Sequence, residues 1–510
     1  MPGGLKILES SLLTSVQRMT GLIGRCFSAP TEREALVLQL LCAGVVAILV
    51  RMTGPALSIG ICVAAAVFLY LVFGPSRPML ALFLIFMVSS QEYRSFVVVP
   101  MGGVEWHPRE FLLFLLLAHW VVKVLQDKST ISAGVIHFSV ATILMFYVQI
   151  ALVGLATQAD IHLIITECRY PIFLLSYFVF VTLLKDRRDV DFYARLVLWT
   201  TIVIALASIS YFVFAYATGV NQNIQNAFGT FVPRLVGSRI VMSVRPMGHM
   251  MYDICIVVLA SLLFCPATTR RRKFEYLVIL ALLFVGVAIM FMRTAYLSVT
   301  FSLIFLVLIS VRPRLAAKLA VGVGVGAIML IIFRNSILPM LGVDVANLDV
   351  SAQARLVETA GAWRMFMNRP ILGNGMGSVF HGLGLAAKTS QLAYAEAQYQ
   401  TIHNAWMYFL FKGGIIGTLL IVIGLGSILI RGLYIARGIQ DTRDRFFMRG
   451  IIAAFAGQLF ATLFMPRLTY PSGYVFIAMV AAAMHMYGKR RAPEASALGQ
   501  DRCQGGLLPV

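Results

Sequence analysis

The most constraining feature of this sequence is a series of long apolar runs, each about as long as a membrane core is thick. One example is VATILMFYVQIALVGLA at 140–156. A helix needs about 20 mainly apolar residues to cross that core, and about 17 suffice. Because no water is present there to satisfy backbone N–H and C=O groups, such runs predict helices. The 510 residues are 59% hydrophobic and only 13% charged, which excludes an ordinary soluble domain.

The pattern of runs predicts an all-α fold, a polytopic integral membrane helical bundle of about 14 (12–14) transmembrane helices. A cytoplasmic segment (1–34) precedes about 11 spans (35–333), a large loop (334–402), three more spans (403–488) and a cytoplasmic tail (489–510). The predicted spans are 35–50, 56–73, 79–90, 110–126, 135–156, 164–184, 195–216, 247–264, 274–292, 294–311, 315–333, 403–430, 449–466 and 472–488.

Clusters of lysine and arginine predict the orientation, because short cytoplasmic loops carry an excess of these residues. Every second connection between the predicted spans contains such a cluster. This alternation places both termini in the cytoplasm. The clusters are KDRRD (185–189), RRRK (270–273), RPRLAAK (312–318), five arginines within 431–449 and KRR (489–491). Orientation explains the net charge of +20, and no basic stripe interleaved with aromatic residues suggests nucleic acid. Residues 1–34 show no cleavable signal peptide.

The loop at 334–402 is much longer than usual connections, and long loops are commonly functional or disordered. Its composition favours order. SAQARLVETAGAWRMFMNRP (351–370) places Leu356, Ala360, Trp363 and Met367 on one helical stripe. We therefore predict an amphipathic helix on the outer membrane face, and Pro370 ends it.

Arginines gather at the outward boundary, where the positive-inside rule does not explain them. They are Arg169, Arg234, Arg239, Arg245, Arg293, Arg355, Arg364 and Arg369. Arginine suits phosphate because its planar fork donates paired, charge-assisted hydrogen bonds. A lipid pyrophosphate at the outer leaflet fits both the charge and the location. The alternative is that these arginines bind phospholipid headgroups or loop carboxylates such as Glu358.

TIHNAWMYFLFKGGIIG (401–417) begins a predicted span with a histidine. An imidazole at this boundary could meet a hydroxyl acceptor and transfer a proton near neutral pH. We expect Asn404 to cap the helix ahead of any chemical role. Gly413, Gly414 and Gly417 would allow close helix contact, and Lys412 would reach protein or lipid polar groups.

These motifs together resemble the O-antigen ligase and O-antigen polymerase superfamily of bacterial polysaccharide enzymes. The family's His-Asn, nine residues, Gly, two residues, Gly pattern is met by His403, Asn404, Gly414 and Gly417. RPILGNGMGSVF (369–380) looks like its Pro-x-Leu-Gly-x-Gly-x-Gly turn, after a helix with Arg355 and Trp363. MRTAYL (292–297) is similar to the family's arginine followed by leucine, here Arg293 and Leu297. The resemblance covers roughly 275–430.

The resemblance implies an inverting, metal-independent glycosyltransferase without a cofactor, in the bacterial inner membrane with its active site periplasmic. It would transfer glycan from an undecaprenyl-pyrophosphate-linked donor to a glycan or lipid A core hydroxyl. Arg293 and Arg355 would hold the pyrophosphate, and His403 would activate the acceptor. Further expected substrate-binding residues are Arg364, Gly375, Arg245, Arg169 and Asn404. Membrane lipids and a chain-length regulator are the other expected partners.

Several alternatives stay open at this point. Ligase and polymerase differ in the acceptor, which the sequence does not state. A lipid-linked oligosaccharide flippase or other transporter is the rival from another class, although such proteins usually show paired repeats and mid-membrane charges. GNGMG (373–377) lacks the strand and helix of a nucleotide-binding loop, so we interpret it as a turn. No carboxylate or cysteine spacing indicates a metal site or a disulfide framework.

Overall fold

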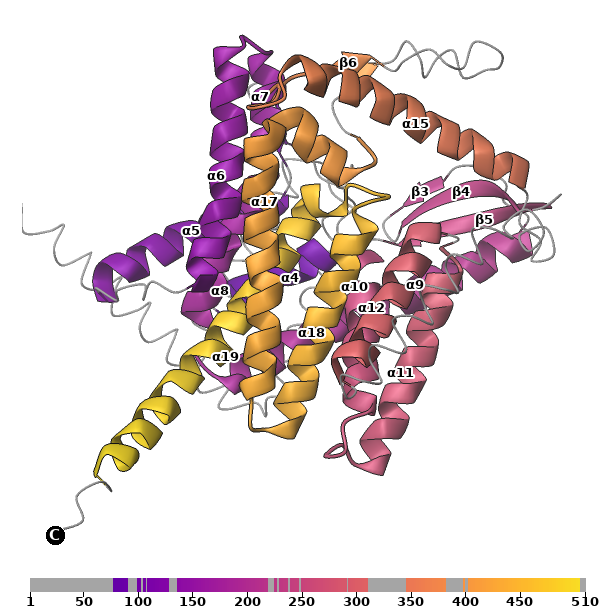
Figure 1. The fold of residues 1–510 in the computed structure, drawn as a ribbon. Coiled ribbons are helices and arrows are strands. Elements are labelled where there is room, and N and C mark those ends of the chain that lie inside the picture. The colour runs from indigo at the N-terminus through magenta and orange to yellow at the C-terminus, as the bar shows by residue number, and fades with distance from the viewer. Residues whose placement is uncertain are drawn as a thin grey trace, which may run out of the picture.

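The computed structural model describes a bundle of helices crossed at one end by a transverse helix (Figure 1). It describes residues 77–89, 99–101, 104–106, 108–127, 135–218, 224–226, 229–236, 239–246, 249–290, 292–310, 345–381, 398–399 and 402–504. The helices are α4 (Arg77–Ser89), α5 (Pro108–Asp127), α6 (Val135–Ala156), α7 (Ile161–Cys168), η1 (Pro171–Leu175), α8 (Ser176–Leu183), α9 (Arg187–Thr218), α10 (His249–Leu263), α11 (Arg270–Ala288), α12 (Arg293–Ser310), α15 (Val345–Asn368), α17 (Ala405–Gly438), α18 (Thr442–Ala461), η2 (Arg467–Thr469) and α19 (Pro471–Gln504).

The helical membrane fold predicted from the sequence is confirmed. Each predicted span within the described residues coincides with a helix or helix pair, whereas 35–50, 56–73 and 315–333 lie outside them. Among the helices described, four are long and apolar enough to cross a membrane: Val135–Ala156, Ile161–Leu183, Arg187–Thr218 and Ala405–Gly438. Met250–Leu263 and Thr294–Ser310 are shorter apolar helices. The predicted span 164–184 is broken, because Pro171 opens a 3-10 turn between α7 and α8.

Small residues let the central helices approach closely. Gly417 and Gly424 of α17 face α6, where a Cβ added to either would press on Phe146 or Ile143. Close contact of this kind replaces the hydrophobic driving force that helices lack inside lipid. The packing holds α6 and α17 side by side (Figure 1).

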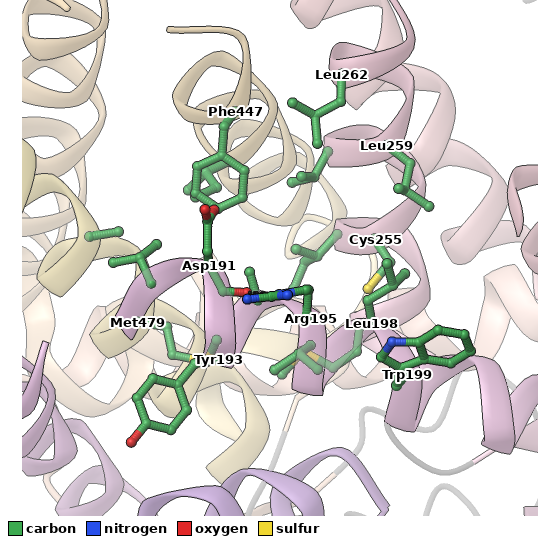
Figure 2. A pocket seen from close by; sticks show the side chains of 18 of the residues that line it. Asp191, Tyr193, Arg195, Leu198, Trp199, Cys255, Leu259, Leu262, Phe447 and Met479 are labelled. Atoms are coloured by element: carbon green, nitrogen blue, oxygen red, sulfur yellow. Dashed lines mark hydrogen bonds between the residues drawn. The ribbon is translucent and has the colours of Figure 1, made fainter. Parts of the chain in front are cut away.

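One end of the bundle is held by ion pairs between predicted cytoplasmic loops. Arg187, at the start of α9, lies 3.0 Å from Asp444 and 3.5 Å from Asp441, which precedes α18. The basic segments 185–189 and 431–449 therefore meet at the same end, as the charge pattern predicts. At this end a cavity of about 450 Å³ opens between α9, α10, α18 and α19 (Figure 2).

Short antiparallel strands occupy the predicted outer loops, which sequence analysis did not anticipate. They are β1 (Val99–Met101) with β2 (Val104–Trp106), the meander β3 (Ile224–Asn226), β4 (Gly229–Val236) and β5 (Arg239–Pro246), and β6 (Phe380–His381) with β7 (Gln398–Tyr399). The meander is fixed to the bundle because the buried Val244 donates its backbone N–H to Ile289, just after α11.

The amphipathic helix predicted within 351–370 is present as α15, which lies across the top of the bundle (Figure 1). Its buried face packs Val357 and Phe366 inward. The predicted apolar stripe is on the other side, where Leu356, Trp363 and Met367 are exposed. A helix with one apolar face in the core and a second one uncovered suits the membrane surface.

Candidate functional site

The candidate site is centred on a histidine paired with a buried carboxylate. His403 Nδ1 lies 2.8 Å and 3.0 Å from the two carboxylate oxygens of Glu358, and the backbone N–H of His403 also donates to this group at 3.3 Å. The Glu358 side chain is 6% exposed, whereas that of His403 is 54% exposed. With Nδ1 donating to the carboxylate, Nε2 carries the lone pair and can accept a proton.

His403 is positioned by the capped start of α17. Asn404 Oδ1 accepts the backbone N–H groups of Trp406 and Met407 at 2.9 Å and 3.1 Å. The N–H of Ala405 donates to the carbonyl of Thr462, next to the end of α18. These bonds satisfy N–H groups that a helix start leaves unpaired. They also confirm the predicted capping role of Asn404. Because His403 directly precedes Asn404, they fix its position as well.

The first turns of α17 form a separate half-helix (405–413), because the chain breaks at Gly414. This glycine has φ 62° and ψ −162°, a conformation that a residue with a Cβ rarely adopts. Beyond the break, the N–H groups of Ile415 and Ile416 donate to the carbonyls of Pro370 and Ile371. Figure 1 shows the resulting bend at the top of α17. The loop after α15 therefore supplies the partners that the broken helix lacks.

The glycine-rich segment 373–377 is a turn packed against α6 and the half-helix. Gly373, Gly375 and Gly377 all have positive φ, between 73° and 78°. A Cβ on Gly375 would overlap the backbone of Gly154 in α6. The N–H of Gly375 donates to the carbonyl of Lys412 at 2.9 Å. The turn predicted for this segment is confirmed, and its glycines are needed for close backbone approach.

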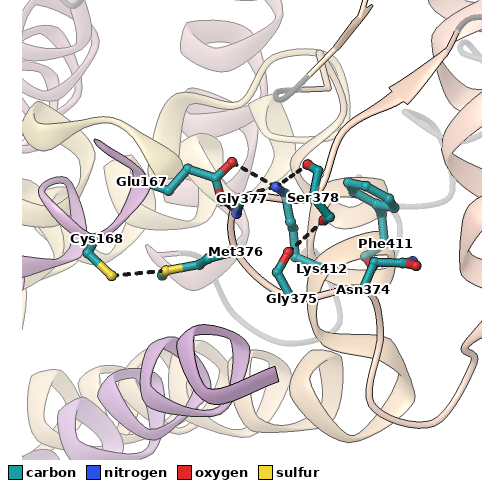
Figure 3. A network of polar contacts seen from close by, with 9 residues as sticks. All are labelled: Glu167, Cys168, Asn374, Gly375, Met376, Gly377, Ser378, Phe411 and Lys412. Carbon is teal, nitrogen blue, oxygen red and sulfur yellow. Dashed lines mark hydrogen bonds and ion pairs between the residues drawn. The ribbon is translucent and has the colours of Figure 1, made fainter. Parts of the chain in front are cut away.

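A fully buried ion pair lies behind this turn (Figure 3). Lys412 Nζ is 2.7 Å from Glu167 Oε1 and 3.0 Å from Oε2, and it donates to the Ser378 carbonyl at 2.8 Å. Glu167 also accepts the N–H of Gly377 at 3.3 Å. The Lys412 side chain is 0% exposed, so it does not reach lipid. The pair joins α7, the glycine turn and the half-helix into one unit.

The two arginines of α15 lie in different surroundings. Arg355 is half-buried and Arg364 is exposed. Arg355 precedes Glu358 by three residues, so their side chains emerge about 60° apart around the helix, on the side that meets His403. Arg364 emerges about 180° from Arg355. The structure thus brings Arg355, and not Arg364, to the face of α15 that carries the His403 partner.

The other predicted arginines lie in three places. Arg293 is the first residue of α12, and its neighbour Thr294 donates to Met465 Sδ at 3.4 Å. Met465 follows α18 closely, so the start of α12 lies near the start of α17. Arg245 is in β5, next to Val244, which bonds to the end of α11. Arg169 is buried and donates to both oxygens of Glu110 at 2.7 Å and 2.9 Å.

Sequence reasoning did not identify Glu358 and Glu167 as site residues. Glu358 entered only as a possible arginine partner, although its place one turn after Arg355 put it on the same helix face. Glu167 and Lys412 each fall inside a predicted span, and charges at that depth usually have a partner. Within the described part of the chain, no three His, Cys, Asp or Glu side chains are grouped to hold a metal ion.

Residues 255–422 match the model of the O-antigen ligase family. This region is similar to that family, and it covers about a third of the 510 residues. The matched region contains Arg293, Arg355, Glu358, Gly375 and His403, and it agrees with the 275–430 resemblance found in the sequence. The ion-pair partner Glu167 precedes it.

Other comparisons add little to the O-antigen ligase match. No curated protein matches this chain in sequence. One similar solved chain belongs to "Structural coordination of polymerization and crosslinking by a peptidoglycan synthase complex". It is 15% identical, with a TM-score of 0.38, over 68% of this chain and 95% of that one. A score this low does not establish a shared fold.

Proposed function

We propose that this protein is a membrane glycosyltransferase that moves glycan from an undecaprenyl-pyrophosphate-linked donor to a hydroxyl acceptor at the periplasmic face. The family match supports a membrane glycan ligase or polymerase. The observation that carries the proposal is the His403–Glu358 pair, which leaves a ring nitrogen exposed at the start of α17. An exposed imidazole held by a buried carboxylate is a common arrangement for a general base.

In the proposed reaction, Nε2 of His403 accepts the proton of the acceptor hydroxyl. The acceptor oxygen bonds to the anomeric carbon of the donor sugar, the bond from that carbon to the pyrophosphate oxygen breaks, and lipid pyrophosphate leaves with the electron pair. Glu358 stabilises the imidazolium that forms. Attack from the side opposite the leaving group inverts the anomeric centre. General-base catalysis contributes about 10²–10⁴-fold in rate.

The reaction also requires that the negative charge on the departing pyrophosphate be neutralised. We assign its neutralisation to Arg293 and Arg355. Arg293 begins α12 beside the end of α18, to which the start of α17 is hydrogen-bonded, and Arg355 lies on α15, which packs against α17. Guanidinium groups bind phosphate oxygens through two parallel hydrogen bonds, which are stronger than neutral ones. The same chemistry serves either acceptor, a second glycan repeat in a polymerase or the lipid A core in a ligase.

The proposal is tested by transfer of labelled glycan from a lipid-linked donor with the full chain in vesicles. His403→Ala and Arg293→Ala should abolish transfer without loss of folded protein. His162→Ala is the matched control, because His162 is an exposed histidine at the start of α7. In cells, the two site variants should accumulate outward-facing lipid-linked glycan. Normal polysaccharide from His403→Ala cells, or donor trapped on the cytoplasmic face as in a flippase defect, would contradict the proposal.

A further inference from the structure

A carboxylate lies buried between membrane helices at the end of the bundle that carries His403. Asp253 is the fifth residue of α10, and its side chain is fully buried. Its Oδ2 accepts an N–H of the side-chain amide of Gln458, in α18, at 3.0 Å. A charged group inside a membrane bundle is costly to bury, so such residues usually have a partner and a function. Gln458 is a partner of Asp253, and the proposed transfer reaction does not yet use either residue.

The amide of Gln458 extends this interaction to a third helix. Its Nε2 carries two N–H groups, and it also donates to Ser298 Oγ, in α12, at 3.1 Å. Because an ionised carboxylate can only accept hydrogen bonds, Asp253 requires the N–H side of the amide to face it. The three side chains are fully buried and join α10, α18 and α12. We call Asp253, Gln458 and Ser298 the polar link.

The polar link lies just below the start of α12 and is connected to the start of α17. Ser298 follows Arg293 by five residues, about 7.5 Å along the helix axis. On α18, the backbone carbonyl of Gln458 accepts the N–H of Thr462 at 3.1 Å, and the carbonyl of Thr462 accepts the N–H of Ala405. A displacement of α12 against α18 at this level would therefore move Arg293 relative to the start of α17.

These helices do not need a charge in order to associate. Gly457 of α18 lies against α12, where an added Cβ would meet the carbonyl of Ser298 at 2.8 Å and the side chain of Ser302. At the other end of the bundle, Ser261 Oγ of α10 donates to the carbonyl of Phe446 in α18. Small residues and neutral hydrogen bonds of this kind bring helices together in lipid. The carboxylate has a more specific role, which is to fix the rotation and height of α12 against α18.

We propose that Asp253 is a positioning residue for glycan transfer, which holds the start of α12, and with it Arg293, where the departing pyrophosphate is bound. This inference rests on the proposed function, in which Arg293 neutralises the pyrophosphate. Asp253 is fully buried and acts through Gln458, so it does not touch the substrate. A misplacement of about 1 Å far from the chemistry can lower a rate about 10²-fold.

The proposal is tested with the full chain, by binding of undecaprenyl pyrophosphate in detergent and by glycan transfer in vesicles. Asp253→Leu removes the carboxylate at similar size. It should weaken undecaprenyl pyrophosphate binding and lower kcat/KM for the donor about 10²-fold, with the KM for the acceptor unchanged. Arg293→Ala should weaken binding as well, and adding Asp253→Leu to it should cause no further loss, because Asp253 acts through Arg293. The matched control is Ser261→Ala, which also removes a hydrogen bond between α10 and α18 and should behave as wild type.

An exchange of the two side chains separates positioning from folding. Gln458→Glu alone places a second carboxylate beside Asp253 and should impair transfer. Adding Asp253→Asn restores an amide paired with a carboxylate, and the carboxylate now on α18 can accept the hydroxyl of Ser298. The double variant should regain most of the lost transfer, while size-exclusion chromatography checks the fold of each protein. If Asp253→Leu does not fold, this exchange decides.

Three results would overturn the inference. They are wild-type binding and transfer by Asp253→Leu, losses of binding that add up when Asp253→Leu is combined with Arg293→Ala, and no recovery in the exchanged pair. Failure of the proposed function has a different signature. Wild type would then transfer no glycan, or Arg293→Ala would transfer it normally, and the role of Asp253 would be refuted with it.

Discussion

His403 Nδ1 and Glu358 Oε2 are 2.8 Å apart although 45 residues of sequence separate them. The contact joins α15, which lies across the bundle, to the start of α17. Glu358 is buried in the face of α15 that packs inward, so the carboxylate stays fixed while the imidazole remains accessible. A histidine held in this way keeps one tautomer, and the carboxylate stabilises the protonated ring during proton transfer.

Glu358→Gln should lower the rate of glycan transfer about 10²-fold, because the amide preserves size but not the charge that stabilises the imidazolium. Glu358→Asp keeps the charge at a longer reach and should give an intermediate rate. Single-turnover transfer in vesicles measures both. Glu275→Gln, at the opposite end of the bundle, serves as the control. A Glu358→Gln protein with the wild-type rate would show that the pair is structural.

Arg355→Ala should reduce transfer more than Arg364→Ala does. Arg355 lies on the Glu358 side of α15, whereas Arg364 is exposed on the other side. Removing one donor that stabilises developing charge costs about 10²–10³-fold in rate. We expect a loss in this range for Arg355→Ala and a loss below about 10-fold for Arg364→Ala. Rates with saturating donor distinguish the two, and the reverse order would place the pyrophosphate on the exposed face.

The sequence predicted the bundle well because a membrane leaves few choices. Span α6 was predicted with its observed bounds, since backbone groups in lipid must be paired within the helix. The sequence did not predict the break at Gly414. A continuous helix that contains a glycine has the same apolar pattern as a helix that is interrupted by another segment. The carbonyls that complete the break come from Pro370 and Ile371, which only tertiary structure identifies.

The site was predicted in part, for a related reason. His403 and Asn404 were found because motif spacing and capping chemistry are local properties of a sequence. The partners Glu358 and Glu167 come from other helices, and pairings across 45 or 245 residues leave no periodic signal.

Lys412→Met should strongly destabilise the protein, because it leaves the buried carboxylate of Glu167 without its cation. Breaking one side of a buried ion pair costs about 3–5 kcal/mol. The double variant Lys412→Met with Glu167→Gln should be more stable than the sum of the single changes implies. Thermal unfolding in detergent for the four proteins gives this coupling. Additive effects would mean that the pair does not join the half-helix to α7.

Gly375→Ala should destabilise the protein and slow transfer, because the new Cβ would meet the backbone of Gly154 at a φ of 78°. The left-handed region alone costs a residue with a side chain about 1–2 kcal/mol. Gly426→Ala is the matched control, since nothing lies within 4 Å of a Cβ at that position in α17. In a helix interior this change should stabilise by about 0.5–1 kcal/mol. Unfolding temperatures in detergent compare the two substitutions. If the two substitutions shift the unfolding temperature equally, the turn does not depend on close backbone contact between Gly375 and α6. The link between this turn and the position of His403 would then be wrong as well.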